Sequence, residues 1–133
     1  MAWVNIQNKV YFGMRKNITD VEIPDSPSPY HEWNGTAWIL NSAKEQEEII
    51  KSLTKSLEDY YDLIAQKKRY DNRLTCALRA GYTGPFQSEG QSFATWMDNC
   101  NAYAYTVMED VLLGNRAIPT AAELLAELPV APW

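Results

Sequence analysis

The residues in this chain best suited to chemistry are one histidine, His31, and two cysteines, Cys76 and Cys100. A zinc site needs about three protein ligands at suitable spacing. These three residues lie far apart, and the sequence contains no C-x-x-C or H-x-x-x-H pair. The acids at positions 47–62 fall mainly on the polar side of a helical pattern, so they do not converge on an ion. We therefore expect no metal site.

The common catalytic motifs are also missing. His31 stands beside Glu32, and no G-x-S-x-G motif accompanies it. Segment 81–90 (GYTGPFQSEG) holds three glycines but no lysine, and Pro85 lacks a backbone donor. A helix-to-helix loop explains this segment better than a phosphate-binding loop. Acids are plentiful, so composition leaves a glycosidase open, yet no pattern pairs two of them. We expect no enzyme, no catalytic residues and no cofactor.

The bulk composition narrows the class of partner. The chain has 133 residues, of which 46% are hydrophobic and 12% aromatic, enough for the core of one modest domain or two small pieces. A net charge of −5 and an isoelectric point near 4.8 argue against nucleic-acid or anionic-membrane partners, which need a basic footprint. No segment approaches the roughly 20 apolar residues of a membrane span. We expect no nucleic-acid or membrane partner.

The cysteines and the first residues predict the compartment of synthesis. The first ten residues (MAWVNIQNKV) lack the basic and apolar regions of a signal peptide. Two separated cysteines do not form a disulfide framework, and each sits in a helix-like pattern typical of a buried thiol. A single bridge between Cys76 and Cys100 stays open. We expect synthesis in a reducing cytoplasm.

Composition changes near Ser42, and this change predicts an α+β fold. A β-rich part over 1–41 contains strand-prone residues in 1–12 and 18–23 and a proline-rich connector at 24–29. Residues 42–133 form a mainly helical region, with helices predicted over 43–69, 71–80, 90–113 and 121–128.

The pair Asn34-Gly35 is the strongest hairpin signal, because a two-residue type I′ turn needs positive φ at both positions. In that register Trp33 pairs with Thr36 and His31 with Trp38, so the two tryptophans need not stack on each other. An isolated hairpin is marginal in water. Its faces must therefore bury against the rest of this chain or against another chain.

The predicted helix over 43–69 carries the clearest periodicity. Ser42 and Glu45 fit a capping box at its start. Its apolar residues are spaced alternately three and four apart, and they are Ile50, Leu53, Leu57, Tyr60 and Ile64. We call these five residues the α-seam. Such a narrow stripe favours coiled-coil packing with another copy. Ile49, Tyr61 and Leu63 widen the stripe, so a helical bundle within the chain stays open.

The remaining helices have recognisable ends. Ser88 or Ser92 is expected to open the third helix, and Gly114 is expected to follow its end. Thr120 and Glu123 form a second capping box before the last helix.

Five tryptophans and eight tyrosines make the chain rich in aromatic residues. Trp96, Tyr60 and Tyr103 fall in helical patterns and are expected in the core. Trp3, Trp33, Trp38 and Trp133 lie outside those patterns, and exposed aromatics suit sugar rings or protein surfaces. We favour protein contact for these four, and sugar binding remains the alternative.

Two segments carry a family resemblance. Residues 29–48 (PYHEWNGTAWILNSAKEQEE) resemble the aromatic-x-x-Trp-[Asn/Asp]-Gly-x-x-Trp element and charged helix of tailed-bacteriophage tail-fibre assembly proteins and of small tail proteins encoded near fibre genes. Residues 71–105 are similar in style to the helical regions of such proteins. Together the two segments cover a little over half of the chain, and the first residues match no family that we recognise.

The resemblance implies a non-enzymatic protein of the tail-fibre or baseplate apparatus. It implies a location in the virion tail after synthesis in the host bacterial cytoplasm, a tail-fibre or baseplate protein as partner, and a homo-oligomer with a trimer favoured. The transfer rests on Trp33, Asn34, Gly35 and Trp38. A permanent virion component, a fibre-assembly chaperone and a host-surface glycan-recognition module are the three alternatives, in that order.

Overall fold

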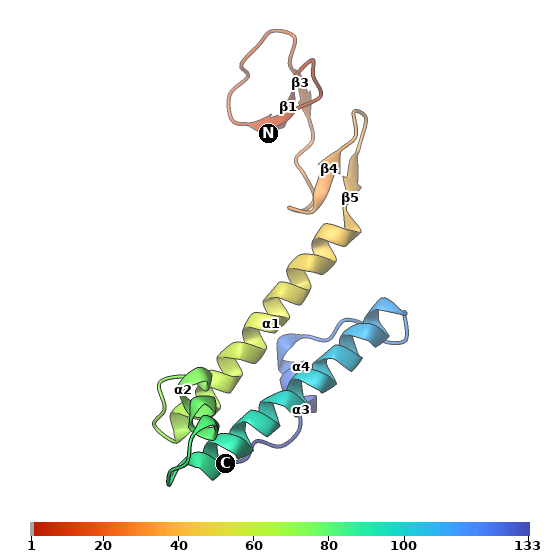
Figure 1. The fold of residues 1–133 in the computed structure, drawn as a ribbon. Helices are drawn as coiled ribbons and strands as arrows, with labels where there is room; N and C mark the ends of the chain where they lie inside the picture. Colours follow the sequence, from red (N-terminus) through yellow and green to blue (C-terminus); the bar gives the residue numbers. More distant parts are fainter. Residues whose placement is uncertain (1) are drawn as a thin grey trace. The chain divides into compact units, whose positions relative to one another are not determined.

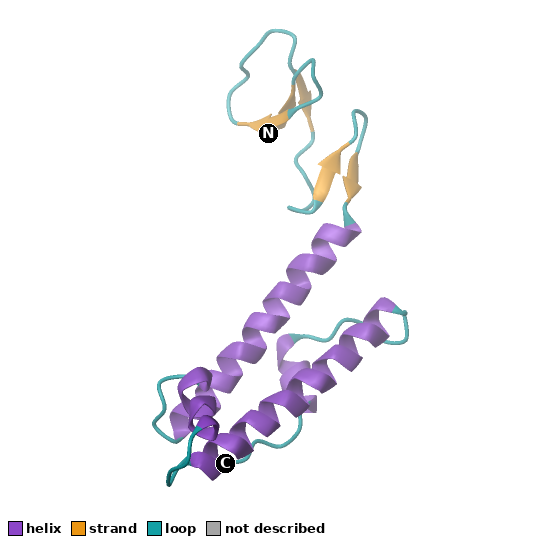
Figure 2. Cartoon of the chain, viewed as in Figure 1, coloured by secondary structure: helices purple, strands orange, loops and turns teal. Residues whose placement is uncertain are grey.

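The structure, a computed structural model, describes residues 2–133 and has the predicted α+β class (Figure 1; Figure 2). Five short strands come first: β1 (Ala2–Val4), β2 (Val10–Phe12), β3 (Val21–Ile23), β4 (His31–Trp33) and β5 (Trp38–Leu40). The helices follow: α1 (Ser42–Lys67), α2 (Arg73–Leu78), the 3-10 helix η1 (Arg79–Gly81), α3 (Gln87–Leu112) and α4 (Ala121–Glu127).

The chain divides into two compact units, Met1–Ile50 and Lys51–Trp133. We call them the N-terminal unit and the helical unit. The boundary was expected at 41/42, where the composition changes. It falls nine residues later, after Ile50, so the first residues of α1 belong to the N-terminal unit.

The N-terminal unit contains a three-stranded antiparallel sheet in the order β2-β1-β3, and a separate β4-β5 hairpin. The β1-β2 turn is closed by the Asn5 side chain, whose Oδ1 accepts from the Gln7 and Lys9 N–H groups, each at 2.9 Å. Asn8 adopts φ 62°, which asparagine tolerates better than most residues. Local side-chain bonds therefore shape this unit.

Helix α1 begins one residue before the expected range, and its cap differs from the prediction. The Lys44 N–H donates to Asn41 Oδ1 at 3.1 Å, so Asn41 caps the helix where Ser42 was expected to. The helix ends at Lys67 instead of residue 69. Arg69 enters the left-handed region at φ 68°, and the Tyr70 N–H reaches back to the Ala65 carbonyl at 3.3 Å.

Helix α3 starts at Gln87, three residues earlier than predicted, and no serine caps it. The Gly90 N–H already bonds to the Phe86 carbonyl at 3.0 Å, so the helical bonds begin before Ser88 can act as a cap. Gly90 also lies against α2 and η1. A Cβ placed on it would stand 2.6 Å from the Ala80 nitrogen. This close approach requires glycine.

Two other predicted helix ends are confirmed. Gly114 adopts φ 77° after α3, and its N–H and that of Asn115 bond to the carbonyls of Val111 and Asp110. This is the Schellman arrangement. Thr120 caps α4 by accepting the Glu123 N–H at 3.2 Å.

The core of the helical unit joins α1, α2, α3 and α4 (Figure 1). Phe93 is fully buried and Trp96 nearly so, and Tyr61 packs edge-on against Trp96 at 5.4 Å between ring centroids. Cys76 and Cys100 are free and fully buried, as expected for small apolar side chains. Burial raises the pKa of each thiol to about 11.

Candidate functional site

The aromatic hairpin is organised by the Asn34 side chain. Asn34 Oδ1 accepts from the Thr36 N–H at 2.9 Å, the Ala37 N–H at 2.8 Å and the Thr36 hydroxyl at 3.1 Å. Gly35 takes φ 105°, a conformation that side-chain-bearing residues rarely adopt. Asn34-Gly35 therefore forms a turn as predicted, but the loop has four residues instead of two.

The longer loop corrects the predicted pairing. Trp33 pairs with Trp38 and His31 with Leu40, whereas the two-residue turn would pair Trp33 with Thr36. The Asn34 N–H donates to the Ala37 carbonyl at 3.1 Å, so the tryptophan pair lies at a non-hydrogen-bonded position, where side chains approach most closely. The two rings meet edge to face at 5.5 Å between centroids. The bonds that Asn34 Oδ1 accepts stabilise the four-residue turn, and this turn places the two rings in contact.

Hydrogen bonds hold the hairpin to the preceding connector. Trp38 Nε1 donates to the Pro24 carbonyl at 2.7 Å, and His31 Nδ1 lies 2.6 Å from the Ser28 hydroxyl. The bond with Ser28 gives His31, the only histidine of the chain, a structural role. Trp33 Nε1 is buried and has no hydrogen-bond partner among residues 2–133.

Trp3 lies in the central strand β1, opposite Tyr11. Its Nε1 donates to the Gly13 carbonyl at 3.1 Å, and the Arg15 guanidinium stands 5.6 Å from its ring. The Tyr11 hydroxyl bonds to the buried Asp20 carboxylate. Desolvation, followed by this hydrogen bond, raises the pKa of Tyr11. Trp3 and Tyr11 thus anchor the loop after β2.

The N-terminal unit leaves seven of its large hydrophobic side chains exposed and buries few of them fully. Its described buried hydrophobic residues are Ala2 and Ile23. The exposed ones are Ile6, Phe12, Met14, Ile18, Val21, Ile39 and Leu40. We call these seven residues the exposed set. Exposed apolar side chains that adjoin one another mark interaction surfaces, and the exposed set supplies side chains for such a surface.

Trp133 differs from the other predicted contact residues. It was expected to meet a partner, but its ring stacks on Phe93 at 5.7 Å and an interplanar angle of 17°. Its Nε1 donates to the Ile64 carbonyl at 2.8 Å. The sequence pattern did not predict this contact, because stacking between residues forty positions apart leaves no local periodicity. Packing within the helical unit accounts for Trp133.

The α-seam also packs largely within the chain. Leu57 and Ile64 are buried in the core of the helical unit, and Leu53 and Tyr60 pack against that core. Tyr60 meets Trp96 edge-on at 5.8 Å. Ile50 is partly buried in the N-terminal unit. The α-seam was expected to form a coiled coil with another copy. Most of it packs instead within the helical bundle of this chain, which is the alternative that Ile49, Tyr61 and Leu63 left open. Assembly into oligomers remains a prediction.

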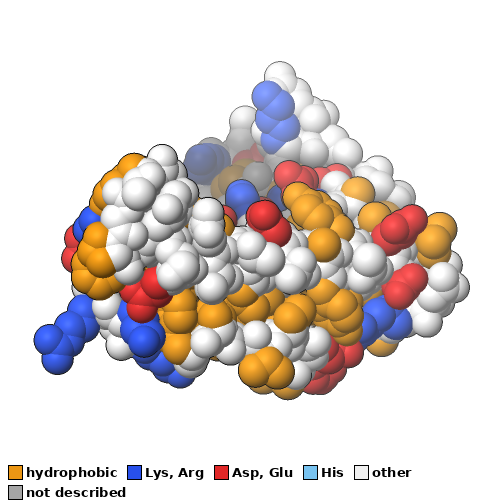
Figure 3. Space-filling model, turned by 60° about the horizontal axis from the view of Figure 1, so that its bottom comes forward, with side chains coloured by type: hydrophobic (Ala, Val, Ile, Leu, Met, Phe, Trp, Pro, Cys, Tyr) orange, Lys and Arg blue, Asp and Glu red, His pale blue; other side chains and the backbone are white. Residues whose placement is uncertain are grey.

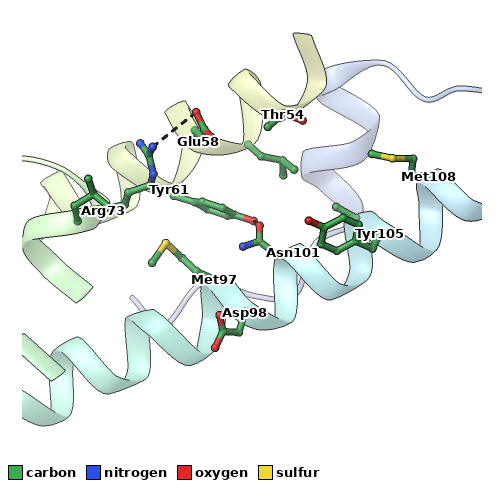
Figure 4. A pocket seen from close by; sticks show the side chains of 12 residues that line it. Thr54, Glu58, Tyr61, Arg73, Met97, Asp98, Asn101, Tyr105 and Met108 are labelled. Carbon is green, nitrogen blue, oxygen red and sulfur yellow. Dashed lines mark hydrogen bonds and ion pairs between the residues drawn. The ribbon is translucent and has the colours of Figure 1, made fainter. Parts of the chain in front are cut away.

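A groove that the sequence did not indicate opens between α1, α2 and α3 (Figure 4). Its volume is about 380 Å³. Tyr61 reaches across from α1, and its hydroxyl donates to Asn101 Oδ1 at 2.8 Å. Burial, followed by the neighbouring Cys100, raises the pKa of Tyr61, so this hydroxyl stays protonated at neutral pH. The groove depends on three separate helices and so has no local sequence signal.

Within residues 2–133, no cluster of three or more His, Cys, Asp or Glu side chains could hold a metal ion. In the same part of the chain, no helix combines the length and the apolar character needed to cross a membrane.

Comparison of the chain with models of protein families, with curated proteins and with solved structures finds no match. The functional assignment therefore rests on the geometry and on the resemblance of the tryptophan hairpin.

Proposed function

We propose that this chain is a non-enzymatic structural protein of a bacteriophage tail-fibre or baseplate apparatus that acts through protein–protein contacts. The observation that carries the proposal is the contrast, inside the N-terminal unit, between the two buried hydrophobic side chains, Ala2 and Ile23, and the seven of the exposed set. A partner surface would bury these side chains, at about 25 cal/mol per Å² of apolar area. The tail assignment comes from the Trp-Asn-Gly-x-x-Trp element.

The ring geometry favours protein contact over glycan binding. A sugar platform needs an aromatic face open to solvent. Trp33 and Trp38 pack against each other edge to face, and both are partly buried. The glycan alternative predicts that Trp33→Ala with Trp38→Ala abolishes binding to host cells while the chain still assembles.

A fibre-assembly chaperone is the second candidate, because exposed apolar side chains also suit transient binding to an incompletely folded fibre. The test is mass spectrometry of purified virions that encode this chain. A fixed ratio to the fibre protein supports the structural role. Absence from virions, with recovery on fibre protein from infected cells, favours the chaperone. Absence from both would overturn the tail proposal.

A further inference from the structure

The groove between α1, α2 and α3 combines a buried apolar floor with an exposed rim (Figure 4). Leu57, Tyr61, Met97 and Ala104 are buried or partly buried, and Tyr105 on the rim is 71% exposed. Met97 and Met108 supply flexible, polarisable surface of the kind that adapts to a bound partner. The groove is therefore open, and its lining is mainly apolar with Glu58, Arg73 and Asp98 as the charged members.

Apolar side chains continue from the groove at helical spacing. Leu78 follows Leu74 by four residues on α2, and Leu112 follows Met108 by four residues on α3. Leu74, Leu78 and Leu112 are all exposed. Hydrophobic side chains also gather in patches between charged ones on the face drawn in Figure 3. From Met97 to Leu112, α3 rises about 22 Å, which matches an α-helix of about 16 residues.

Most of the charged side chains beside the groove are acidic. The Arg73 guanidinium is matched by Asp62, whose two carboxylate oxygens each lie 3.0 Å from Nη1. Glu58 stands farther from Arg73, at 3.7 Å, and Asp98 forms no ion pair among the described residues. Helix α3 carries Glu89, Asp98, Glu109 and Asp110 and no lysine or arginine. Three acids, Glu58, Asp62 and Asp98, therefore stand against one arginine, so the groove offers an excess of negative charge to an occupant.

We propose that this groove receives an amphipathic helix of another protein, with an apolar stripe facing Tyr105 and Met108 and lysine or arginine residues beside Asp98 and Glu58. Helix-in-groove binding uses apolar anchors at such spacing, and complementary charge fixes the orientation. A second copy that paired its α3 with this α3 would bring like charges together, so that pairing fits less well. The inference goes beyond the proposed function, since it concerns the helical unit whether or not the chain is a tail protein.

The test begins with a displayed library of helical peptides of about four turns, selected on the full-length chain. The best-enriched peptide is then synthesised in two forms, as selected and with its basic residues replaced by glutamate. We expect apolar residues at i, i+3 or i+4, and i+7 with an excess of Lys and Arg. Tyr105→Asp should weaken binding at least tenfold, or about 1.4 kcal/mol. Asp98→Lys should reverse the preference between the two peptides.

Ser92→Asp is the matched control, because Ser92 is exposed on a different face of the same helix. It should leave the peptide affinity unchanged, and circular dichroism verifies that each variant keeps its helix content. Several results would overturn the proposal: no helical pattern enriched, equal binding of the two peptides, or binding unaffected by Tyr105→Asp. Self-association that sedimentation detects and Tyr105→Asp abolishes would identify a second copy as the occupant and refute a foreign helix.

Discussion

The two units of this chain are stabilised in different ways. The helical unit buries eleven hydrophobic residues in one cluster around Phe93 and Trp96. The N-terminal unit buries Ala2 and Ile23 and relies on local bonds, such as those from Asn5 and Asn34 to their own turns. Short strands with little buried apolar surface are marginally stable by themselves. We expect the helical unit to fold independently and the N-terminal unit to gain stability from a partner.

The largest expected effect comes from removing the centre of the helical core. Phe93 is fully buried and stacks on Trp133. Phe93→Ala should lower the free energy of unfolding by about 3–5 kcal/mol through lost burial and a residual cavity. Urea unfolding followed by circular dichroism measures this. Phe86→Ala, at a residue 53% exposed, is the control and should cost far less. Equal costs would mean that the core is not centred on Phe93.

A smaller effect is expected where α3 approaches η1. Gly90→Ala in an open helix would be neutral or stabilising, but here the new Cβ would stand 2.6 Å from the Ala80 nitrogen. We expect destabilisation of about 1–3 kcal/mol from overpacking. Gly81→Ala meets nothing within 4 Å and serves as the control. A thermal midpoint of Gly90→Ala at or above that of the wild type would contradict the close approach.

The next largest effect is expected at alkaline pH, which should lower the free energy of unfolding of the helical unit. Burial raises the pKa of Cys76 and Cys100 from 9.0 to about 11, so the unfolded chain releases these protons at lower pH than the folded chain. Their contribution is complete below pH 9.0 and is lost as pH rises through about 11. At about pH 10 the loss is about 1 kcal/mol per thiol.

Urea unfolding as a function of pH tests this prediction. Replacing both cysteines with alanine should flatten the alkaline decline of stability. Tyr70, whose pKa burial raises to about 12, continues to contribute at higher pH in that variant. An unchanged slope between neutral pH and pH 10 would show that the thiols are not buried as described.

The smallest effect concerns the hairpin. Trp38→Ala removes the edge-to-face contact with Trp33 and the bond to Pro24, at a cost of about 1 kcal/mol confined to the N-terminal unit. Amide hydrogen exchange in β4 and β5 should accelerate, while the urea midpoint of the helices stays constant. Ile39→Ala, at an exposed position on the other strand face, is the control. A shift in the helical midpoint would disprove the independence of the two units.

Local patterns predicted local structure well. The change of composition near Ser42, the turn at Asn34-Gly35 and the terminator Gly114 all indicated elements that the structure contains. These signals succeed because turns and caps depend on backbone conformations that few residue types adopt. Cap positions were predicted less well, since Asn41 caps α1 where Ser42 was expected to.

Hydrophobic periodicity did not predict the contacts between distant segments. The sequence determined that the chain has a β-rich start, an amphipathic helix, predicted over 43–69, and no recognisable catalytic motif. Only the tertiary structure decided that Tyr60 of the α-seam packs on Trp96, that Trp133 stacks on Phe93 and that Tyr61 and Tyr105 line one groove. The physical reason is that an apolar stripe specifies burial but not its partner, which depends on how separate helices fit together.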